Sequence, residues 1–189
     1  MVSKKYIKYR DKKYAFAFDT EKKFSGLTTT ELQNISRKDR YGKDYGGLDT
    51  IQELEKYCKK KKCVYQLINK KNVKLYFDFD KKDFNGGECS EEQLTTIINT
   101  IISSVKTLFN VEIDTTDFIV ETDKKIGKYQ SIHIIIDNFM CNVYENKLLS
   151  KYLIDNGINN DNCVYSKYRQ FRLLGMKKIY KTDEDILVS

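Results

Sequence analysis

The sequence predicts an α+β domain in which helices pack against a partly antiparallel sheet. Segments with the two-residue alternation of β-strands and segments with the helical repeat follow one another along the chain. Short turns between some of the strands indicate hairpins, and such a mixture is typical of the α+β class. The chain has 189 residues, of which 40% are hydrophobic, so it can bury one core. No repeat or linker divides it, and we expect residues 1–189 to form a single domain.

The N-terminal third is predicted to hold short strands, a long loop region and one helix. The strands are expected near Tyr14–Phe18, and a loop-rich stretch interrupted by glycines follows them. Asp49 is placed to cap the helix, whose apolar residues, such as Leu54 and Tyr57, recur at helical spacing on one face.

The remainder of the chain is predicted to contain five strands and two helices. The strands are expected at Val64–Ile68, Val73–Asp80, Phe118–Glu121, Gln130–Asp137 and near Phe171–Leu174. Ser90 opens the clearer helix, because Gln93 three residues later completes a capping box. The second helix spans Tyr144–Asp155 and ends at Gly157, since glycine readily takes the left-handed conformation after a helix.

Composition and charge exclude several classes of protein. The apolar runs are too short to cross a bilayer, and the N-terminus lacks the apolar segment of a secretory signal. The five cysteines are scattered without a C-x-x-C pair, and a single histidine cannot complete a zinc knuckle. We therefore expect reduced thiols, an intracellular location and no structural zinc. The net charge of +7 favours a polyanionic partner such as nucleic acid.

Asp78 and Asp80 are the first candidates for chemistry. They stand two residues apart on a predicted strand, so both carboxylates project from one face, about 7 Å apart at the backbone. Two such carboxylates repel each other unless a cation lies between them, and Mg²⁺ or Mn²⁺ suits their oxygens. The alternative is a pair of solvated acids at a strand end, beside Lys81 and Lys82.

Ser131 and His133 repeat this spacing on another predicted strand. A hydroxyl and an imidazole on one face are suited to hold the phosphate oxygens of a bound nucleotide. The alternative is that His133 is a core residue whose hydrogen bonds are satisfied, which is the commoner role of a lone histidine in a strand.

A third group combines an aspartate with arginines and aromatic residues. Asp161 precedes the segment Val164–Leu173, which contains Arg169 and Arg172 and is followed by Lys178. Arginines interleaved with aromatic side chains suit a surface that stacks bases and pairs with phosphates. The arginines are three residues apart, so either a turn intervenes or one faces the nucleotide and the other the template. The alternative is a basic, solvated edge strand.

The order of these three groups resembles the archaeo-eukaryotic primase superfamily, most closely its PrimPol and large-DNA-virus primase branch. Leu75–Asp80 resembles the first motif of that family, a carboxylate pair after a hydrophobic strand. Ser131–His133 resembles its S-x-H motif. Asp161 with Val164–Leu173 resembles the third motif, in which an aspartate precedes a V-Y-x-x-x-R-x-F-R-L segment. The motif-bearing core is then residues 64–178, with residues 1–60 as an N-terminal part.

The resemblance implies a fold and a set of site residues. The implied fold is a catalytic core with an RRM-like mixed sheet flanked by helices and an N-terminal α/β subdomain. The three acidic positions that would bind two Mg²⁺ or Mn²⁺ ions are Asp78, Asp80 and Asp161. The positions that would contact the incoming nucleotide are Ser131, His133, Arg169, Arg172 and Lys178.

The implied activity is that of a DNA-directed primase or polymerase, which adds (d)NTPs to a 3′-hydroxyl at a site of DNA replication. Its expected partners are a single-stranded DNA template and a primer strand. The family often primes with a zinc-binding or helicase module, so we expect such a module from a partner or a longer chain. One residue departs from the eukaryotic PrimPol relatives, which carry a glutamate where Asp80 stands.

Two other functions remain open on the sequence alone. The first is a non-catalytic, RRM-like module that binds nucleic acid. The second is a haloacid-dehalogenase-type phosphatase, because a hydrophobic strand followed by D-x-D also opens that active site. That motif usually has threonine or valine two residues after the second aspartate, where this chain has Lys82, and it normally lies near the N-terminus.

Overall fold

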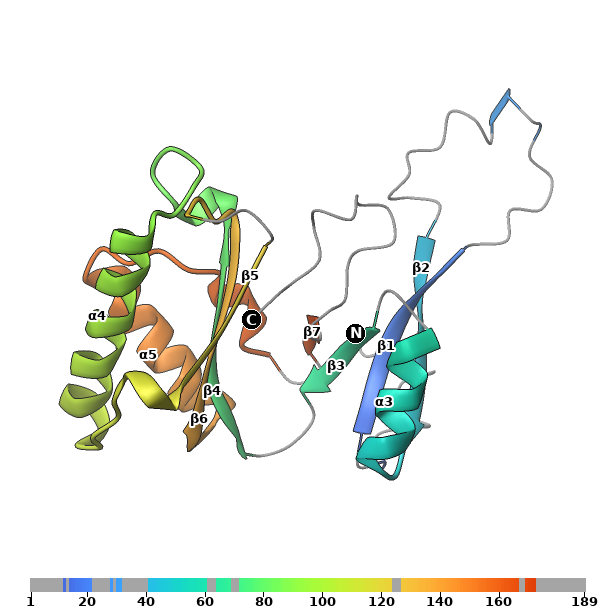
Figure 1. Cartoon of the computed structure of the whole chain (residues 1–189), viewed down its shortest axis with the longest axis horizontal. Helices are drawn as coiled ribbons and strands as arrows, with labels where there is room; N and C mark the ends of the chain where they lie inside the picture. The colour runs from blue at the N-terminus through green and yellow to red at the C-terminus, as the bar shows by residue number, and fades with distance from the viewer. Residues whose placement is uncertain are drawn as a thin grey trace. The chain divides into compact units, whose positions relative to one another are not determined.

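The computed structural model describes residues 12, 14–21, 28, 30–31, 41–60, 64–68, 72–123, 127–166 and 169–172. The described helices and strands belong to two compact units, and the boundary between them in the sequence follows Asn69. The last strand, β7, returns to the sheet of the first unit (Figure 1). Each unit has its own sheet and is described by itself.

The first unit contains a four-stranded sheet in the order β2-β1-β3-β7. Its strands are β1 (Tyr14–Glu21), β2 (Tyr41–Leu48), β3 (Val64–Ile68) and β7 (Arg169–Arg172). β1 pairs antiparallel with both β2 and β3. The helix α3 (Ile51–Lys60) lies between β2 and β3 in the sequence. Its Leu54 packs with Phe16 of β1 and Val64 of β3 in one hydrophobic core.

The strand β2 stands where the sequence was expected to form loops. Gly46 on β2 lies opposite Phe16 on β1. A Cβ atom at residue 46 would lie only 2.4 Å from the Phe16 ring, so the glycine leaves room for the ring across the strand pair. At residues 41–48 the loop expectation is wrong, because pairing with β1 overrides the low strand propensity of glycine.

The cap of α3 also differs from the expectation. The Glu53 N–H donates to Thr50 Oγ1 at 3.2 Å, and the Thr50 N–H donates to Glu53 Oε2 at 3.1 Å. These reciprocal bonds form a capping box, and the hydrogen bonds from Thr50 hold the pKa of Glu53 below its usual value. Asp49 instead pairs with Lys12 at 2.7 Å, so the prediction that it caps the helix is wrong.

The second unit contains a three-stranded antiparallel sheet in the order β4-β6-β5. Its strands are β4 (Asn72–Asp80), β5 (Phe118–Thr122) and β6 (Ser131–Asn142). The helices α4 (Glu91–Phe109) and α5 (Val143–Asp155) lie side by side on one face of this sheet (Figure 1). The fully buried apolar side chains of β4 and β6 are Leu75, Phe77, Phe79, Ile132, Ile134 and Ile136. They alternate along the two strands, so the core lies on one face of the sheet.

The termini of α4 and α5 follow the sequence-based expectations. Ser90 caps α4, with the Gln93 N–H donating to Ser90 Oγ at 3.2 Å and the Ser90 N–H donating to Gln93 Oε1 at 2.9 Å. Gly157, just after α5, has a φ of +85°, a conformation that suits glycine. Both expectations are confirmed.

The described residues form two antiparallel sheets and three helices, so the predicted α+β class is confirmed. The strands expected at Val64–Ile68 and Val73–Asp80 correspond to β3 and β4. Within the same part of the chain, no helix combines the length and the apolar character that a membrane span requires.

The four described cysteines are free thiols in contrasting environments. Burial raises the pKa of Cys89 to about 11, and burial together with the charge of Glu145 raises the pKa of Cys141 to about 12. The thiolate is the reactive form, so both buried thiols are unreactive at neutral pH. Cys163, in contrast, is exposed.

We predict that iodoacetamide alkylates Cys163 in the folded protein at pH 8, while Cys89 and Cys141 react only after unfolding. The reason is that burial both shields these two sulfur atoms and suppresses their ionisation. Peptide mapping by mass spectrometry, with and without denaturant, measures the modification at each site. Alkylation of Cys89 in the folded protein as fast as that of Cys163 would contradict this packing.

Candidate active site

The pairing of β4, β6 and β5 brings several acidic and polar residues to one end of the three-stranded sheet. Asp78 lies opposite His133, and Asp80 lies opposite Ser131. Glu121 on β5 faces His133 from the other side of β6. Because side chains alternate along a strand, these five residues project from the face that does not carry the buried core.

His133 lies between two carboxylates. Its Nδ1 is 3.2 Å from Glu121 Oε2, and its Nε2 is 3.5 Å from Asp78 Oδ1. The histidine is 3% exposed and the glutamate 6%, whereas the side chain of Asp78 is 20% exposed. The row of three side chains therefore runs from a buried acid to one that solvent reaches.

Asp161 reaches this end of the sheet through a backbone hydrogen bond. Its N–H donates to the carbonyl of Asp78 at 2.9 Å. The following turn, η3 (Asn162–Val164), is capped by Asp161, whose Oδ1 accepts from the Cys163 N–H at 3.0 Å. The Tyr76 hydroxyl donates to the Val164 carbonyl at 3.1 Å, which holds the same segment against β4.

A short turn after β4 adds a lysine and a fifth acid. This turn is η1 (Lys81–Asp83), and Asp83 Oδ2 accepts from the Asp80 N–H at 2.8 Å. The Lys82 ammonium lies 3.4 Å from Asp161 Oδ2. Partial burial alone would lower the pKa of Lys82, but the charges of Asp161, Asp83 and Asp80 raise it overall.

The turn also concentrates negative charge. Burial raises the pKa of Asp83, and the carboxylates of Asp80 and Asp161 add to the rise. The hydrogen bond from the Asp80 N–H and the charge of Lys82 oppose it. A carboxylate whose pKa is raised by burial and by its acidic neighbours is stabilised in its charged form by a further positive charge nearby.

The Ser131 hydroxyl is buried and makes no hydrogen bond to any described residue. Its backbone is held in place, since the Ser131 N–H donates to Asp123 Oδ1 at 3.3 Å and the Gln130 N–H donates to the same oxygen at 2.9 Å. Leaving a buried hydroxyl unpaired costs about 1–3 kcal/mol. A hydroxyl in this state is a ready donor for an oxygen of a bound ligand.

The remaining sequence-predicted residues are Arg169, Arg172 and Lys178. Arg169 and Arg172 are the first and last residues of β7, so they belong to the four-stranded sheet rather than to the sheet that carries the acidic residues. Lys178 lies outside the described residues. The structure therefore groups Asp78, Asp80, Ser131, His133 and Asp161 at one end of the three-stranded sheet.

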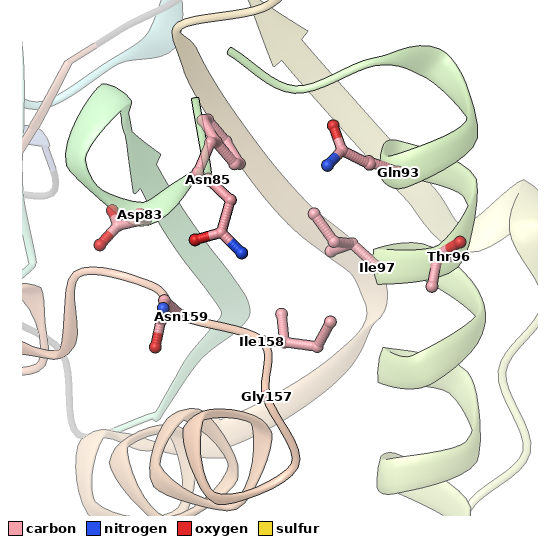
Figure 2. A pocket seen from close by; sticks show the side chains of 9 residues that line it. Asp83, Asn85, Gln93, Thr96, Ile97, Gly157, Ile158 and Asn159 are labelled. Carbon is pink, nitrogen blue, oxygen red and sulfur yellow. The ribbon is translucent and has the colours of Figure 1, made fainter. Parts of the chain in front are cut away.

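A cavity of about 170 Å³ opens beside the η1 turn. It is lined by Asp83, Phe84, Asn85, Gln93, Thr96, Ile97, Gly157, Ile158 and Asn159. Figure 2 shows Asn85, Ile97 and Ile158 pointing into the space between α4 and the segment after α5. Asp83 belongs both to this wall and to the acidic turn, so the cavity adjoins the candidate site.

Three residues of the site were not predicted from the sequence: Lys82, Asp83 and Glu121. Lys82 was interpreted only as a neighbour of the two aspartates. Glu121 carried a signal, since an acid inside the apolar segment Phe118–Thr122 is unusual in a short strand. Its meaning depends on the β5–β6 register, which places it opposite His133.

The chain was compared with known protein families and with curated proteins. No family model matches it, and no curated protein is significantly similar to it.

Proposed function

We propose that this chain is a template-directed nucleotidyltransferase, the catalytic domain of a DNA primase or polymerase that adds nucleotides to a 3′-hydroxyl. The observation that carries the proposal is the hydrogen bond from the Asp161 N–H to the Asp78 carbonyl. It brings together two acidic positions that are far apart in the sequence and that resemble the first and third motifs of one enzyme family. Asp80 and Ser131 lie opposite each other on the adjoining strands.

The residues of this site fit a divalent cation in three respects. Their oxygen donors are carboxylates, which hard ions such as Mg²⁺ and Mn²⁺ prefer. The Lys82 ammonium stands against Asp161, so a positive charge already occupies part of the cluster. The buried Ser131 hydroxyl has no described partner and can serve a ligand. Among the described residues, no three His, Cys, Asp or Glu side chains are arranged as a ready-made metal site.

The proposed roles follow from where the side chains lie. Asp78, Asp80 and Asp161 would hold two divalent ions, whose chemistry in such a transfer is activation of the 3′-hydroxyl and neutralisation of the leaving pyrophosphate. Ser131 would donate a hydrogen bond from its hydroxyl to a phosphate oxygen. His133 would orient its neighbours in this cluster. Positioning and fixed charge then supply most of the rate.

The net charge of +7 supports a nucleic-acid partner for the same reaction. Arg169, Arg172 and Lys178 would contact the nucleotide or the template, and binding to single-stranded DNA would weaken as salt rises. The proposed setting is a site of DNA replication, with a primer strand and, for initiation, a zinc-binding or helicase module as further partners.

We predict that Asp78→Asn lowers nucleotide incorporation by about a hundredfold or more, because it replaces a metal-binding carboxylate with an amide of the same shape. The measurement is primer extension on a single-stranded template, with deoxy- and ribonucleotides and with Mg²⁺ or Mn²⁺. The control is Asp137→Asn, which removes a carboxylate of β6 that pairs with Lys74 at the surface. This control should extend primers as the wild type does.

Other outcomes of this assay separate the rival functions. Template binding without incorporation by the wild-type chain at any metal concentration would identify a non-catalytic binding module. Hydrolysis of a phosphate monoester, abolished by Asp78→Asn, would identify a phosphatase. If Asp78→Asn extends primers at the wild-type rate, Asp78 is not part of the proposed site.

We predict that Lys82→Gln binds Mn²⁺ up to about fivefold more tightly than the wild type. The Lys82 ammonium competes with a metal ion for the same carboxylates, and an ion pair exposed to this degree contributes about 1 kcal/mol at most. The measurement is titration of free Mn²⁺ by electron paramagnetic resonance. Lys81→Gln makes the same charge change one residue away and should bind Mn²⁺ with less gain. Equal affinities for the wild type and Lys82→Gln would contradict this competition.

A further inference from the structure

One row of side chains crosses all three strands of the second unit's sheet. Glu121 on β5, His133 on β6 and Asp78 on β4 lie opposite one another in the register of the sheet. We call them the cross-strand triad. Each nitrogen of the central imidazole faces one carboxylate, at 3.2 Å for Glu121 and 3.5 Å for Asp78.

The burial of Glu121 calls for a reason. The residue is 6% exposed, and a carboxylate removed from water in this way is strongly unfavourable unless it is paired. An apolar side chain at the same position would fill the strand without that penalty. The partner that the structure gives this carboxylate is Nδ1 of His133. The contact with His133 therefore offsets part of the cost of burying the Glu121 carboxylate.

The two carboxylates that contact His133 differ in their exposure to solvent. A carboxylate accepts a hydrogen bond from Nδ1–H and thereby selects the tautomer and the orientation of the ring. The other nitrogen then faces Asp78, whose side chain is 20% exposed, while the ring itself is nearly inaccessible at 3%. His133 therefore contacts Asp78 and has almost no contact with solvent.

We propose that Glu121 is a positioning residue: it holds Nδ1–H of His133 and so directs Nε2 at the carboxylate of Asp78. Its effect on metal binding rests on the proposed function, in which Asp78 is a metal ligand. In metal sites generally, the groups that hydrogen-bond to the ligands orient them and tune the affinity of the site. In this proposal Glu121 acts on the metal-binding residue Asp78 through His133 and not by direct contact.

The chain offers an unusually clean test, because His133 is its only histidine. In ¹⁵N-histidine-labelled protein, the two ring nitrogens give one pair of signals that report the tautomer directly. At a pH where the ring is neutral, we expect the proton on Nδ1 in the wild type. Glu121→Leu should move the proton to Nε2 or give a mixture, since a free imidazole favours Nε2–H.

Glu121→Gln is the second variant, because it preserves the shape of the side chain and keeps an oxygen acceptor. It should retain a larger share of the Nδ1–H form than Glu121→Leu does. The same tautomer in all three proteins would overturn the proposal. So would a ring that stays protonated on both nitrogens at every pH tested, because the two carboxylates would then hold it alike.

The consequence for the site is measured with Mn²⁺ alone. Glu121→Leu should bind Mn²⁺ about tenfold more weakly than the wild type, as expected for a group that supports a metal ligand. If the effect passes through His133, Glu121→Leu should cause no further loss in a His133→Gln background. Asp137→Asn should leave the affinity unchanged. Independent, additive losses would overturn the route through the histidine.

Failure of the proposed metal site and failure of the inference about Glu121 give different results. If the wild type binds no Mn²⁺, or binds it equally after Asp78→Asn, the proposed metal site fails, and the tautomer still decides whether Glu121 holds His133. If Mn²⁺ binds at Asp78 but Glu121→Leu changes neither the tautomer nor the affinity, the inference about Glu121 fails and the proposed function stands.

Discussion

The register of β6 between β4 and β5 is the constraint on which the polar site depends. A slip of one residue would turn Ser131 and His133 toward the core and expose Ile132 and Ile134. Those two isoleucines are fully buried, so the slip would remove large apolar side chains from the core. The apolar face of β6 therefore sets the geometry of its polar face. The order of Glu121, His133 and Asp78 across the strands follows from packing on the side that carries no chemistry.

The same sheet end concentrates acids, and the molecule compensates for this in different ways. Lys82 supplies charge to Asp161, while the Asp80 N–H supplies a hydrogen bond to Asp83. Burial and the neighbouring acids still raise the pKa of Asp83. These contacts therefore offset the repulsion among the acids only in part. Lys82 contributes to this offset with a side chain that is 62% exposed to solvent.

Local patterns predicted most of the second unit, because its elements agree with their own propensities. Ser90 with Gln93 marked the start of α4. The two-residue spacing of Asp78 and Asp80 placed both carboxylates on the same face of β4. Two kinds of feature escaped prediction. The strand around Gly46 forms against its propensity because Phe16 fills the space across the sheet. Contacts between distant segments depend on strand pairing, which a single sequence does not display.

The segment after α5 both covers the edge of β4 and carries a residue of the proposed site. β4 is an outer strand of its sheet, and an uncovered strand edge invites pairing with another chain. The segment after α5 covers part of this edge, since the Asp161 N–H bonds to the Asp78 carbonyl and the Tyr76 hydroxyl bonds to the Val164 carbonyl. The ring centroids of Tyr76 and Tyr165 lie 5.4 Å apart, and this aromatic contact also holds the segment against β4. Protecting the edge therefore also delivers the third carboxylate, and a change that loosened the cover would displace Asp161 from Asp78.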